Sequence, residues 1–389
     1  MTTSPNATFD ADVAIVGAGV VGLAVAAELA RTRSVVVIER HEGIARETSS
    51  HNSQVVHAGI YYPTGSLKHL LCVEGRERLY AWCEARGVPA RRSGKLIVAT
   101  HESEIEGLEG VWQQALVNGI EGMSRLTPAE ARQREPAVPA VGALLSTNSG
   151  VVDAFAFARS LEAAARADGA LFAFRHDVRG VHRDAEGFTL HLAGPAGEAS
   201  TLRCAALVNS AGHGAPALAE GLGYDLDGGA GGPILRQRVN RGRYYDLVSA
   251  RARRAVSASV YPVPHGTGDM PEYMRRAGGL GVHITVDIEG GVHLGPDAEW
   301  LAAAVPLDYR ADDSQRAAFL AAGQRLLPFL EDADIAPGQV GYRPKIEVSG
   351  EDADDFVIWG DHGYVHLGGI ESPGLTAALA IARRVAGQL

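Results

Sequence analysis

Apolar and polar positions form distinct blocks along the first forty residues. Residues 13–16 are a short β-branched run, three glycines follow within six positions, and residues 23–30 (LAVAAELA) are apolar and rich in alanine. A second β-branched run at 35–38 ends at Glu39. Short β-branched runs are typical of buried strands, whereas a longer apolar, alanine-rich segment favours a helix. The pattern therefore predicts strand, turn, helix and strand in this order.

Similar patterns continue through the rest of the chain. Residues 153–167 carry apolar side chains from Phe155 to Ala165 at the spacing of a helix face. Residues 170–175, the stretch around Val178 and residues 204–209 are predicted as strands. Residues 282–287 and 291–294 alternate in strand fashion around Glu289-Gly290-Gly291, which predicts a hairpin. The last segment, 374–389, has the pattern of a helix entered through a Pro-Gly turn.

Composition narrows the class of protein. Glycine makes up 47 of 389 residues, which predicts many tight turns and close backbone approaches. A formal net charge of −10 disfavours a role in binding nucleic acid or anionic membranes. The three cysteines form no CxxC pair, so we predict no disulfide framework and no metal site, and we expect a cytoplasmic location. No secretory signal or spanning segment is visible in the sequence, and peripheral contact with a membrane stays open.

The glycines of the first turn have the spacing of a dinucleotide-binding site. Gly17, Gly19 and Gly22 form a GxGxxG motif between the predicted strand and helix. Gly17 allows a tight turn, Gly19 lets the backbone approach a pyrophosphate, and Gly22 permits close packing of helix on strand. The N-terminus of the helix would present unpaired N–H groups to the anion, and Val20 is a further predicted contact of the cofactor. Glu39, at the end of the second strand, can accept hydrogen bonds from an adenosine ribose, which argues against NADP.

The residues after Glu39 favour FAD over NAD. Arg40 is followed by the polar stretch 48–54, where NAD-binding folds usually continue into another helix. Such a loop can wrap the ribityl chain and pyrophosphate of a larger cofactor. The predicted contacts in this stretch are Ser49, Ser50, Asn52, Ser53 and Gln54.

A longer stretch of the chain resembles a known family. Residues 50–62 (SHNSQVVHAGIYY) are similar to the HNSGVIHSGIYY segment of the L-2-hydroxyglutarate dehydrogenases and oxidases, which belong to the D-amino-acid-oxidase-like flavoproteins. The similarity continues through residues 65–68, 94–98, 150–153, 261–264, 280–283 and 294–296. It departs at Gln54, where the family usually has glycine, and in the C-terminal stretches 341–345 and 369–376.

The resemblance implies a mixed α/β (α+β) fold in which a Rossmann-like FAD-binding domain is interleaved with an antiparallel-sheet substrate domain. We predict the FAD-binding domain at 1–90, 150–215 and 335–389, and the substrate-binding domain at 91–149 and 216–334. The resemblance places a second dinucleotide turn after residue 209 and a flavin loop before the last helix, whose N-terminus would face the flavin pyrimidine. The further cofactor contacts implied are Val178, Ala211, Gly212, Gly369, Ile370, Glu371, Ser372, Gly374, Leu375 and Thr376.

The implied reaction is the oxidation of a small L-2-hydroxy acid, with L-2-hydroxyglutarate to 2-oxoglutarate as the first choice, by hydride transfer from C2 to flavin N5. The candidate bases are His57 and His283, because histidine accepts a proton near neutral pH. A packing role is the alternative for each histidine, and His57 has a further one, since a histidine in a similar place carries covalent flavin in dimethylglycine-dehydrogenase-like relatives.

Binding a carboxylate requires cations or hydroxyl donors. The candidates are Arg343, Lys345 and the three tyrosines Tyr61, Tyr62 and Tyr261. Lys345 has a second interpretation, as a catalytic residue beside flavin N5 or N1, and Arg343 has one as an ion pair within the fold. Lys68 is predicted to lie at the surface.

Two other functions remain open from the sequence. The same fold serves oxidases of amino acids and secondary amines, and it also serves non-catalytic binding proteins. The identity of the acid, the electron acceptor (oxygen, quinone or another) and the oligomeric state are not predicted.

Overall fold

The computed structural model describes residues 9–229, 232–264, 281–302, 306–348, 351–352 and 355–389. The chain forms two compact units, each assembled from separated segments: unit 1 comprises residues 1–50, 155–238 and 344–389, and unit 2 comprises 51–154 and 239–343. The two units are interleaved along the chain. They differ from the predicted domain bounds, because residues 51–90, 150–154 and 335–343 group with unit 2 and residues 216–238 with unit 1.

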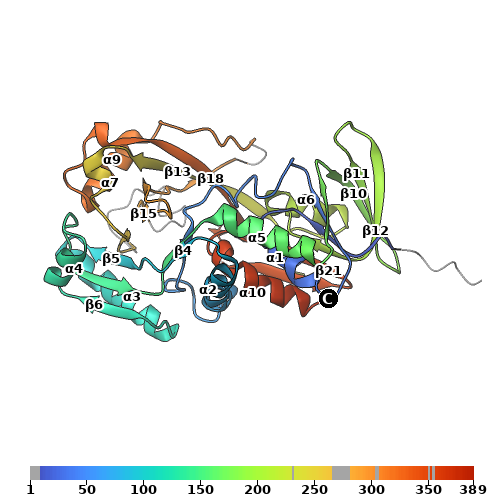
Figure 1. Ribbon diagram of the computed structural model, residues 1–389, viewed down its shortest axis with the longest axis horizontal. Helices are drawn as coiled ribbons and strands as arrows, with labels where there is room; N and C mark the ends of the chain where they lie inside the picture. The colour runs from blue at the N-terminus through green and yellow to red at the C-terminus, as the bar shows by residue number, and fades with distance from the viewer. Residues whose placement is uncertain (1–8, 230–231, 265–280, 303–305, 349–350, 353–354) are drawn as a thin grey trace, which may run out of the picture. The chain divides into compact units, whose positions relative to one another are not determined.

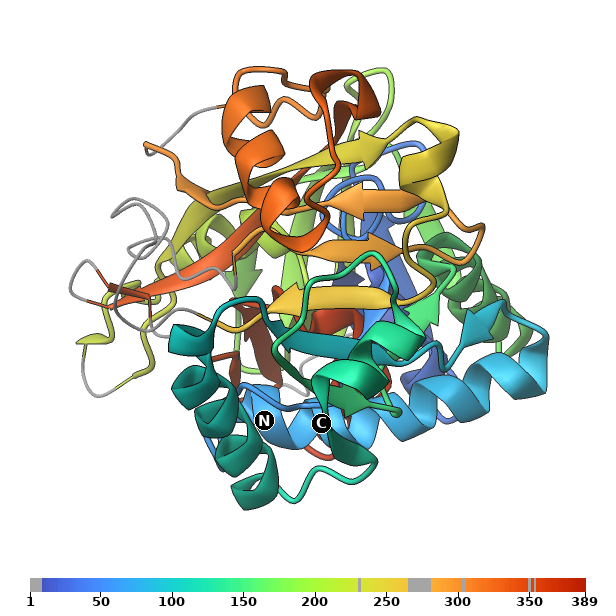
Figure 2. The same ribbon diagram turned by 90° about the vertical axis from the view of Figure 1, so that its left-hand side faces the viewer.

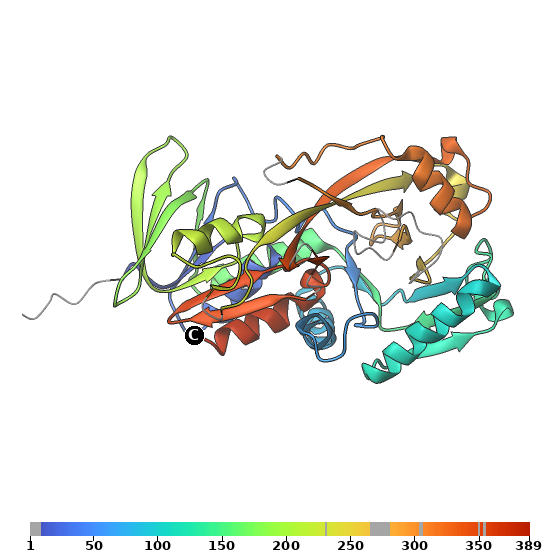
Figure 3. The ribbon, with the colours of Figure 1, turned by 180° about the vertical axis from the view of Figure 1, so that it is seen from behind.

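Unit 1 is built on a mostly parallel sheet. Strands β9, β2, β1, β12 and β21 are neighbours in that order and run parallel. Strands β10 and β11 extend the sheet antiparallel to β12, as Figure 3 shows in yellow-green, and β20 pairs antiparallel with β21. The strands are β1 (Ala11–Val16), β2 (Val35–Glu39), β9 (Leu171–Phe174), β10 (Asp177–Arg183), β11 (Phe188–Ala193), β12 (Ala199–Asn209), β20 (Val357–Asp361) and β21 (Tyr364–Gly368).

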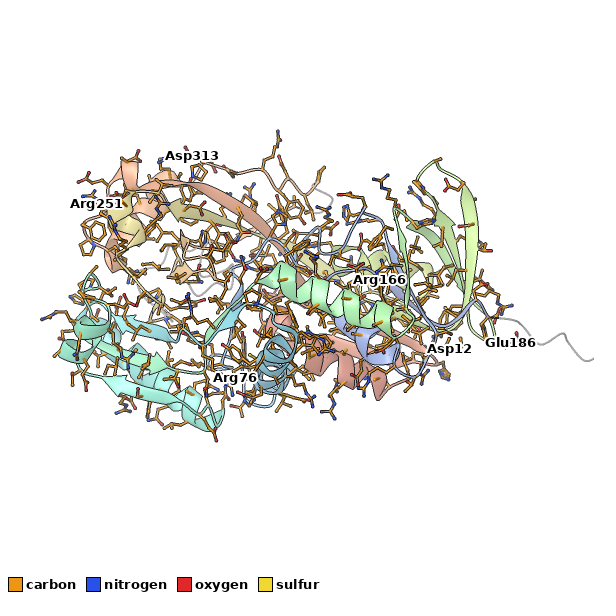
Figure 4. All side chains as sticks on the ribbon, in the orientation of Figure 1. Asp12, Arg76, Arg166, Glu186, Arg251 and Asp313 are labelled. Carbon is orange, nitrogen blue, oxygen red and sulfur yellow. The ribbon has the colours of Figure 1, made fainter. Side chains whose placement is uncertain are left out.

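The helices of unit 1 match the patterns in the sequence. They are α1 (Val20–Leu29), α5 (Ala154–Ala167), α6 (Ala215–Gly221) and α10 (Gly374–Ala386). Helix α1 is buried almost all round, which explains its lack of polar positions, and it packs beside α10 (Figure 1). At the last turn of α5, Arg166 lies 4.2 Å from the centre of the Phe172 ring (Figure 4). Strands β1 and β2, with the glycine turn and α1 between them, confirm the strand, turn, helix and strand predicted from the first forty residues.

Unit 2 contains a second, largely antiparallel sheet. Its order is β18-β13-β16-β15-β14-β5-β7-β6, with β17 beside β13 and with one parallel pair, β14 and β5 (Figure 2). The strands are β5 (Lys95–Ala99), β6 (Met123–Leu126), β7 (Gly142–Ser146), β13 (Gln237–Leu247), β14 (Ser259–Pro262), β15 (Ile284–Val286), β16 (Val292–Leu294), β17 (Glu299–Trp300) and β18 (Ile335–Val348). The predicted hairpin is confirmed by the antiparallel pairing of β15 with β16.

The helices of unit 2 are α2 (Leu67–Arg86), α3 (Ile105–Val117), α4 (Pro128–Arg134), α7 (Ala250–Arg253) and α9 (Arg316–Leu326). A small sheet of β3 (Val55–Val56), β8 (Gly150–Val152) and β4 (Ala90–Arg91) joins segments before and after α2. Helix α2 is tied to the chain that follows β3, because Arg76 Nη1 donates to the carbonyl of Ala58 (3.1 Å; Figure 4 shows Arg76 on α2). These contacts explain why residues 51–90 belong to unit 2.

Two further stretches of the sequence, the glycine-rich residues 228–232 and the basic pair Arg275-Arg276, lie partly or wholly outside the described residues. Each unit has its own apolar core. In unit 1 it includes Ile38, Phe188 and Leu207, and in unit 2 the larger of two clusters includes Leu96, Val260 and Phe319. The predicted mixed α/β architecture, with a dinucleotide fold and a largely antiparallel sheet, is confirmed.

Candidate active site

The first glycine turn is closely packed. Gly17 has a φ of +102°, a left-handed conformation that residues with a Cβ rarely adopt. A Cβ on Gly17 would lie 2.5 Å from the main-chain oxygen of Ser210, and one on Gly22 would lie 2.1 Å from that of Gly17. Both glycines are therefore required by the space available between this turn and the end of β12.

The first turn of α1 packs against Ser49. Val20 N donates to Ser49 Oγ (2.9 Å), and a Cβ on Gly19 would lie 3.1 Å from the same oxygen. The first turn of α1, all of it within the described chain, contains no acidic residue. Helix N-termini of this kind attract phosphate through unpaired N–H groups and the helix dipole.

Glu39 is buried at the end of β2 and holds the turn in place. Its Oε2 accepts from Ala18 N and its Oε1 from His41 N, each at 2.8 Å. Each carboxylate oxygen has a further lone pair, so Glu39 can still accept from a ribose hydroxyl. The next residue, Arg40, forms an ion pair with Glu47, and Ser50 Oγ donates to the carbonyl of Glu47 (3.1 Å).

A second turn lies beside the first. Strands β1 and β12 run parallel with Val16 opposite Asn209, so residues 210–212 leave the sheet at the same edge as the glycine motif. Ala211 N donates to Asn209 Oδ1 (3.3 Å), and Gly212 has a φ of +56°. Val178 lies in β10, opposite Leu192.

The C-terminal loop follows the next parallel strand. Gly369, with a φ of +64°, comes directly after β21, and the loop leads into α10 at Gly374. Thr376 is fully buried in the first turn of α10, whereas Ser372 is exposed. The other predicted contacts in this loop and helix start are Ile370 and Leu375. Three segments that we predicted to bind the cofactor thus leave one sheet at the carboxyl ends of parallel strands.

Lys345 and Glu371 form a buried ion pair in unit 1. Lys345 Nζ lies 3.0 Å from Glu371 Oε1, and both side chains are less than a tenth exposed. A lysine whose charge is balanced by its own carboxylate is a weaker anchor for a substrate carboxylate than one without such a partner. Lys345 is thus a weaker candidate than Arg343 for binding the substrate carboxylate.

The polar loop at 52–54 belongs to unit 2. Asn52 Oδ1 accepts from Gln54 N (2.9 Å), and Ser53 bonds to the hydroxyl of Tyr244. Gln54 has a φ of +56°, which accounts physically for the usual glycine here. Its side chain offers a compensation, since Oε1 accepts from Ala154 N at the start of α5 (3.4 Å).

Six other residues in unit 2 form what we call the basic–aromatic cluster. They come from the loop after β3, from β5, from β14, from the approach to β15 and from β18. The cluster consists of His57, Tyr61, Lys95, Tyr261, His283 and Arg343. Ring contacts and electrostatic effects on pKa values connect its members.

His283 has a defined tautomer. Its Nδ1 lies 2.9 Å from the carbonyl of Gly281, which can only accept, so Nδ1 carries the proton and Nε2 keeps a lone pair. The ring stacks on Tyr261, with centroids 3.8 Å apart. Burial, followed by the charges of Lys95 and Arg343, lowers the pKa of His283 to about 3. The imidazole is therefore neutral at pH 7 and able to accept a proton.

His57 is held by α2. The thiol of Cys72 donates to the His57 carbonyl (3.4 Å), and Arg76 holds the following residue. Burial, and then the charges of Lys95 and His283, lowers the pKa of His57 to about 3. His57 is thus also neutral at pH 7, and both candidate bases remain available in the same cluster.

Among the described residues, the guanidinium of Arg343 bonds to neutral oxygen atoms. Its Nη1 bonds to Asn240 Oδ1 and its Nη2 to the main-chain oxygen of Asp297 (3.0 Å), both neutral acceptors. The carboxylate of Asp297 is itself bonded by the buried guanidinium of Arg243. Both described hydrogen-bond acceptors of Arg343 are thus neutral atoms, and the nearby carboxylate of Asp297 is bonded to Arg243.

Tyr61 and Tyr62 lie on a loop that Asn118 holds from the end of α3. Asn118 Nδ2 donates to the carbonyls of Gly59 (3.1 Å) and Tyr62 (2.9 Å). Its Oδ1 accepts from Thr64 Oγ1 (2.5 Å). Asn118 is buried, and no motif in the sequence pointed to it.

We expect Asn118→Ala to loosen this loop without removing a reacting group. The loss of buried hydrogen bonds should lower the free energy of unfolding by about 2 kcal/mol. The KM for substrate should rise several-fold while kcat changes little, because only binding geometry is affected. Urea unfolding and steady-state kinetics measure the two effects. An unchanged KM would show that the loop does not position substrate.

Two lysines are buried although their burial was not predicted from the sequence. Lys68, predicted at the surface, is buried with only 2% of its surface exposed, so that prediction is wrong. It lies at the start of α2, where the helix packs into the unit rather than against solvent. Lys95, which the sequence analysis did not select, is 1% exposed within an apolar strand. A single charged residue beginning an otherwise apolar strand was the signal available.

Within the described residues, no group of three or more His, Cys, Asp or Glu side chains is arranged to hold a metal ion. Over the same part of the chain, no helix is long and apolar enough to cross a membrane.

A glycine turn, an acid at the end of the second strand and a second turn at the same sheet edge define a dinucleotide-binding α/β protein. The residues present fit FAD, since a Cβ at Gly17 or Gly22 would close the turn against the neighbouring backbone. The model of the FAD dependent oxidoreductase family, DAO, matches residues 12–388. The chain belongs to this family, and its cofactor is FAD.

Proteins similar in sequence to this chain indicate which members of the family it resembles. The mitochondrial L-2-hydroxyglutarate dehydrogenase of Arabidopsis thaliana is 37% identical over 416 residues, which cover 96% of this chain and 82% of that protein. The human protein of the same name is 29% identical, covering 97% of this chain and 88% of that one. The resemblance noted from the sequence is thus confirmed. The alternative of a non-catalytic binding protein is wrong, because the family and these relatives are oxidoreductases.

Solved structures agree on the fold. The L-α-glycerophosphate oxidase of Mycoplasma pneumoniae with FAD bound has a TM-score of 0.81 at 27% identity, covering 97% of this chain and 94% of that one. Glycine oxidase from Geobacillus kaustophilus has a TM-score of 0.76 at 22% identity, covering 98% and 95%, and supports the fold alone.

Proposed function

We propose that this protein oxidises L-2-hydroxyglutarate to 2-oxoglutarate. The observation that carries the proposal is the 37% identity, over nearly the whole chain, to a protein named L-2-hydroxyglutarate dehydrogenase. The basic–aromatic cluster supports it, because Arg343 and Lys95 offer two cationic groups to a substrate with two carboxylates.

The side chains have distinct roles in this proposal. Arg343 binds the carboxylate next to the carbon that is oxidised, with the forked geometry that suits a carboxylate. His283 Nε2 accepts the proton of the C2 hydroxyl, because its lone pair is free and the imidazole is neutral at pH 7. When bound, FAD supplies the acceptor for the hydride that leaves C2. His57 remains the second candidate base, and Tyr62 a further candidate contact.

The charges of the cluster favour a hydroxy acid over an amine. The cations that lower the pKa values are Lys95 for both histidines and Arg343 for His283, and no acidic group is among the causes for either. An ammonium group would meet no counter-charge there, whereas a dianion would meet two. An oxidase of amino acids or secondary amines, the sequence-based alternative, is the function that a substrate panel must exclude.

The test is an anaerobic titration of the FAD-loaded protein with L-2-hydroxyglutarate, its D-enantiomer, L-lactate, L-glutamate and glycine. We expect only L-2-hydroxyglutarate to bleach the flavin absorbance stoichiometrically and fast. The D-enantiomer is the matched control, since it carries the same charges with the C2 hydrogen on the wrong face. Faster bleaching by an amino acid would overturn the proposal in favour of the amine-oxidase alternative.

We also propose a cytoplasmic location. It is supported by three buried cysteines that form no disulfide, as expected in a reducing compartment.

Reoxidation of the reduced protein by oxygen and by a soluble quinone, followed by stopped flow, would identify the electron acceptor.

A further inference from the structure

The chain uses lysine only three times among its 36 basic residues, and all three lysines are buried. Lys345 has its buried partner Glu371, as described above. Lys95 has none of this kind: no hydrogen bond or ion pair joins its amino group to the described part of the chain. A buried cation without an anionic partner is costly, and such groups usually serve a ligand.

Two tyrosine rings flank the amino group of Lys95. Nζ lies 4.7 Å from the ring centre of Tyr61 and 4.4 Å from that of Tyr261, distances at which a cation is attracted to an aromatic face. These contacts hold the ammonium group but leave its three N–H donors without acceptors. Strand β5 supplies the lysine and its parallel neighbour β14 supplies Tyr261, so the pair is fixed by the sheet.

The two flanking tyrosines also have hydroxyl groups without partners. The oxygens of Tyr61 and Tyr261 are both buried and make no hydrogen bond with any described residue. Buried hydroxyls are nearly always hydrogen-bonded in folded proteins, so each points to a group that binds there. One ammonium and two hydroxyl donors match the acceptor capacity of a single carboxylate.

The proposed reaction already uses Arg343 for one carboxylate, which leaves Lys95 for another. The pKa of His283 responds to the charges of both Lys95 and Arg343, whereas the charges that act on His57 are those of Lys95 and His283. His283 thus lies within the electrostatic range of two separate cations. A substrate whose C2 is near His283 can reach one cation with C1 and the other with the far end of its chain.

We propose that Lys95, together with the hydroxyls of Tyr61 and Tyr261, binds the carboxylate at the far end of the substrate and so makes the enzyme selective for dicarboxylic 2-hydroxy acids. This inference rests on the proposed function and assigns the specificity of that same site. It distinguishes Lys95 from Arg343, whose carboxylate is common to every 2-hydroxy acid.

Protonation of Lys95 gives the site a pH dependence of known sign. Burial lowers the pKa of Lys95 to about 7, against a small opposing effect of Cys72. The neighbouring groups are the guanidinium of Arg343, the imidazoles of His57 and His283 with pKa values of about 3, and Tyr61, Tyr261 and Cys72, whose pKa values burial raises. Anion binding should therefore weaken as pH rises through about 7, while a bound carboxylate should raise the pKa of Lys95.

The first experiment needs no turnover. In FAD-loaded protein labelled with ε-¹³C lysine, three side-chain signals are expected, which Lys68→Arg and Lys345→Arg variants assign. Glutarate, a five-carbon dicarboxylate without a hydroxyl, should shift the Lys95 signal and raise its titration midpoint. Butyrate, with one carboxylate, should leave it unchanged. A Lys95 signal that ignores glutarate at saturation would overturn the inference.

The second experiment measures specificity. Lys95→Met should lower kcat/KM for L-2-hydroxyglutarate by roughly 10- to 100-fold while changing that for L-2-hydroxyvalerate less than threefold. Arg78→Met is the matched control, since it removes an exposed cation on α2 and should leave the ratio of the two values unchanged. An equal loss with both substrates would place Lys95 at the C1 carboxylate and contradict the proposal.

The two proposals fail in different ways. If neither hydroxy acid reduces the wild-type flavin, the proposed function fails, whatever glutarate does to the Lys95 signal. If L-2-hydroxyglutarate is oxidised but Lys95→Met leaves the specificity ratio intact, only the assignment of Lys95 fails.

Discussion

Replacement of Gly17 by alanine should yield a protein that no longer retains FAD. The added Cβ would lie 2.5 Å from the Ser210 carbonyl oxygen and 3.0 Å from its carbon, both backbone atoms that cannot rotate away. The φ of +102° adds strain for any residue with a Cβ. The turn must therefore open, which displaces the N-terminus of α1 from the pyrophosphate. We expect the Kd for FAD to rise at least ~100-fold, or about 2.7 kcal/mol.

Flavin absorbance per chain after gel filtration measures retention, and titration of the apoprotein with FAD measures the Kd. Gly110→Ala is the matched control, because Gly110 is an exposed residue of α3 with no atom within 4 Å of a Cβ placed there. That variant should keep its FAD and gain about 0.5–1 kcal/mol in unfolding free energy. A Gly17→Ala protein that purifies with one FAD per chain would show that the glycine turn does not bind the cofactor.

His283→Ala should slow anaerobic flavin reduction by roughly 10²- to 10⁴-fold while FAD stays bound. The variant removes the Nε2 lone pair that we assign to the C2 hydroxyl proton, and it leaves the dinucleotide turns of unit 1 intact. Because the pKa of His283 is about 3, the base is unprotonated across the neutral range. The kcat/KM of the wild type should thus fall on the acid side only as pH approaches 3, and on the alkaline side above about 7, where Lys95 loses its proton.

His293→Ala is the control for the removal of a histidine from the same unit. His293 lies between Asp246 (2.7 Å) and Asp287 (3.0 Å), whose hydrogen bonds raise its pKa although burial opposes the charge. Below pH 6.5 this variant should have a lower free energy of unfolding than the wild type, because the charged His293 that both aspartates stabilise is missing. The difference should shrink as pH rises through the raised pKa of His293. The rate of flavin reduction should stay unchanged. A rate within tenfold of wild type for His283→Ala would exclude His283 as the base and leave His57.

The dinucleotide half of the molecule could be predicted because its information is local. The strand, glycine turn, helix and acid lie within forty residues, and each residue type follows from the backbone it must adopt, as at Gly17. The spacing of apolar residues along 153–167 predicted α5 to within one residue at its start. Patterns that one segment carries by itself survive folding with little change.

The substrate-binding residues were harder to predict because they come from segments that lie far apart in the sequence. Lys95, Tyr261 and Arg343 are brought together by a sheet whose pairing, such as β5 parallel to β14, has no signature in either strand alone. Strand β5 is buried on both faces, which conceals Lys95 among apolar residues. Asn118 acts through carbonyls of a distant loop, so its side chain type gave no indication of its partners.

The distribution of basic residues determines how the electrostatic potential outside the protein changes with pH. With every lysine buried, the permanent positive charge of the exposed side chains is carried by guanidinium groups, which stay protonated up to about pH 12. The three thiols are buried as well, with pKa values near 12. The electrostatic potential outside the molecule should thus stay nearly constant between pH 8 and 10, where most proteins begin to discharge their surface amines. Whatever changes in anion affinity over that interval originates inside the protein.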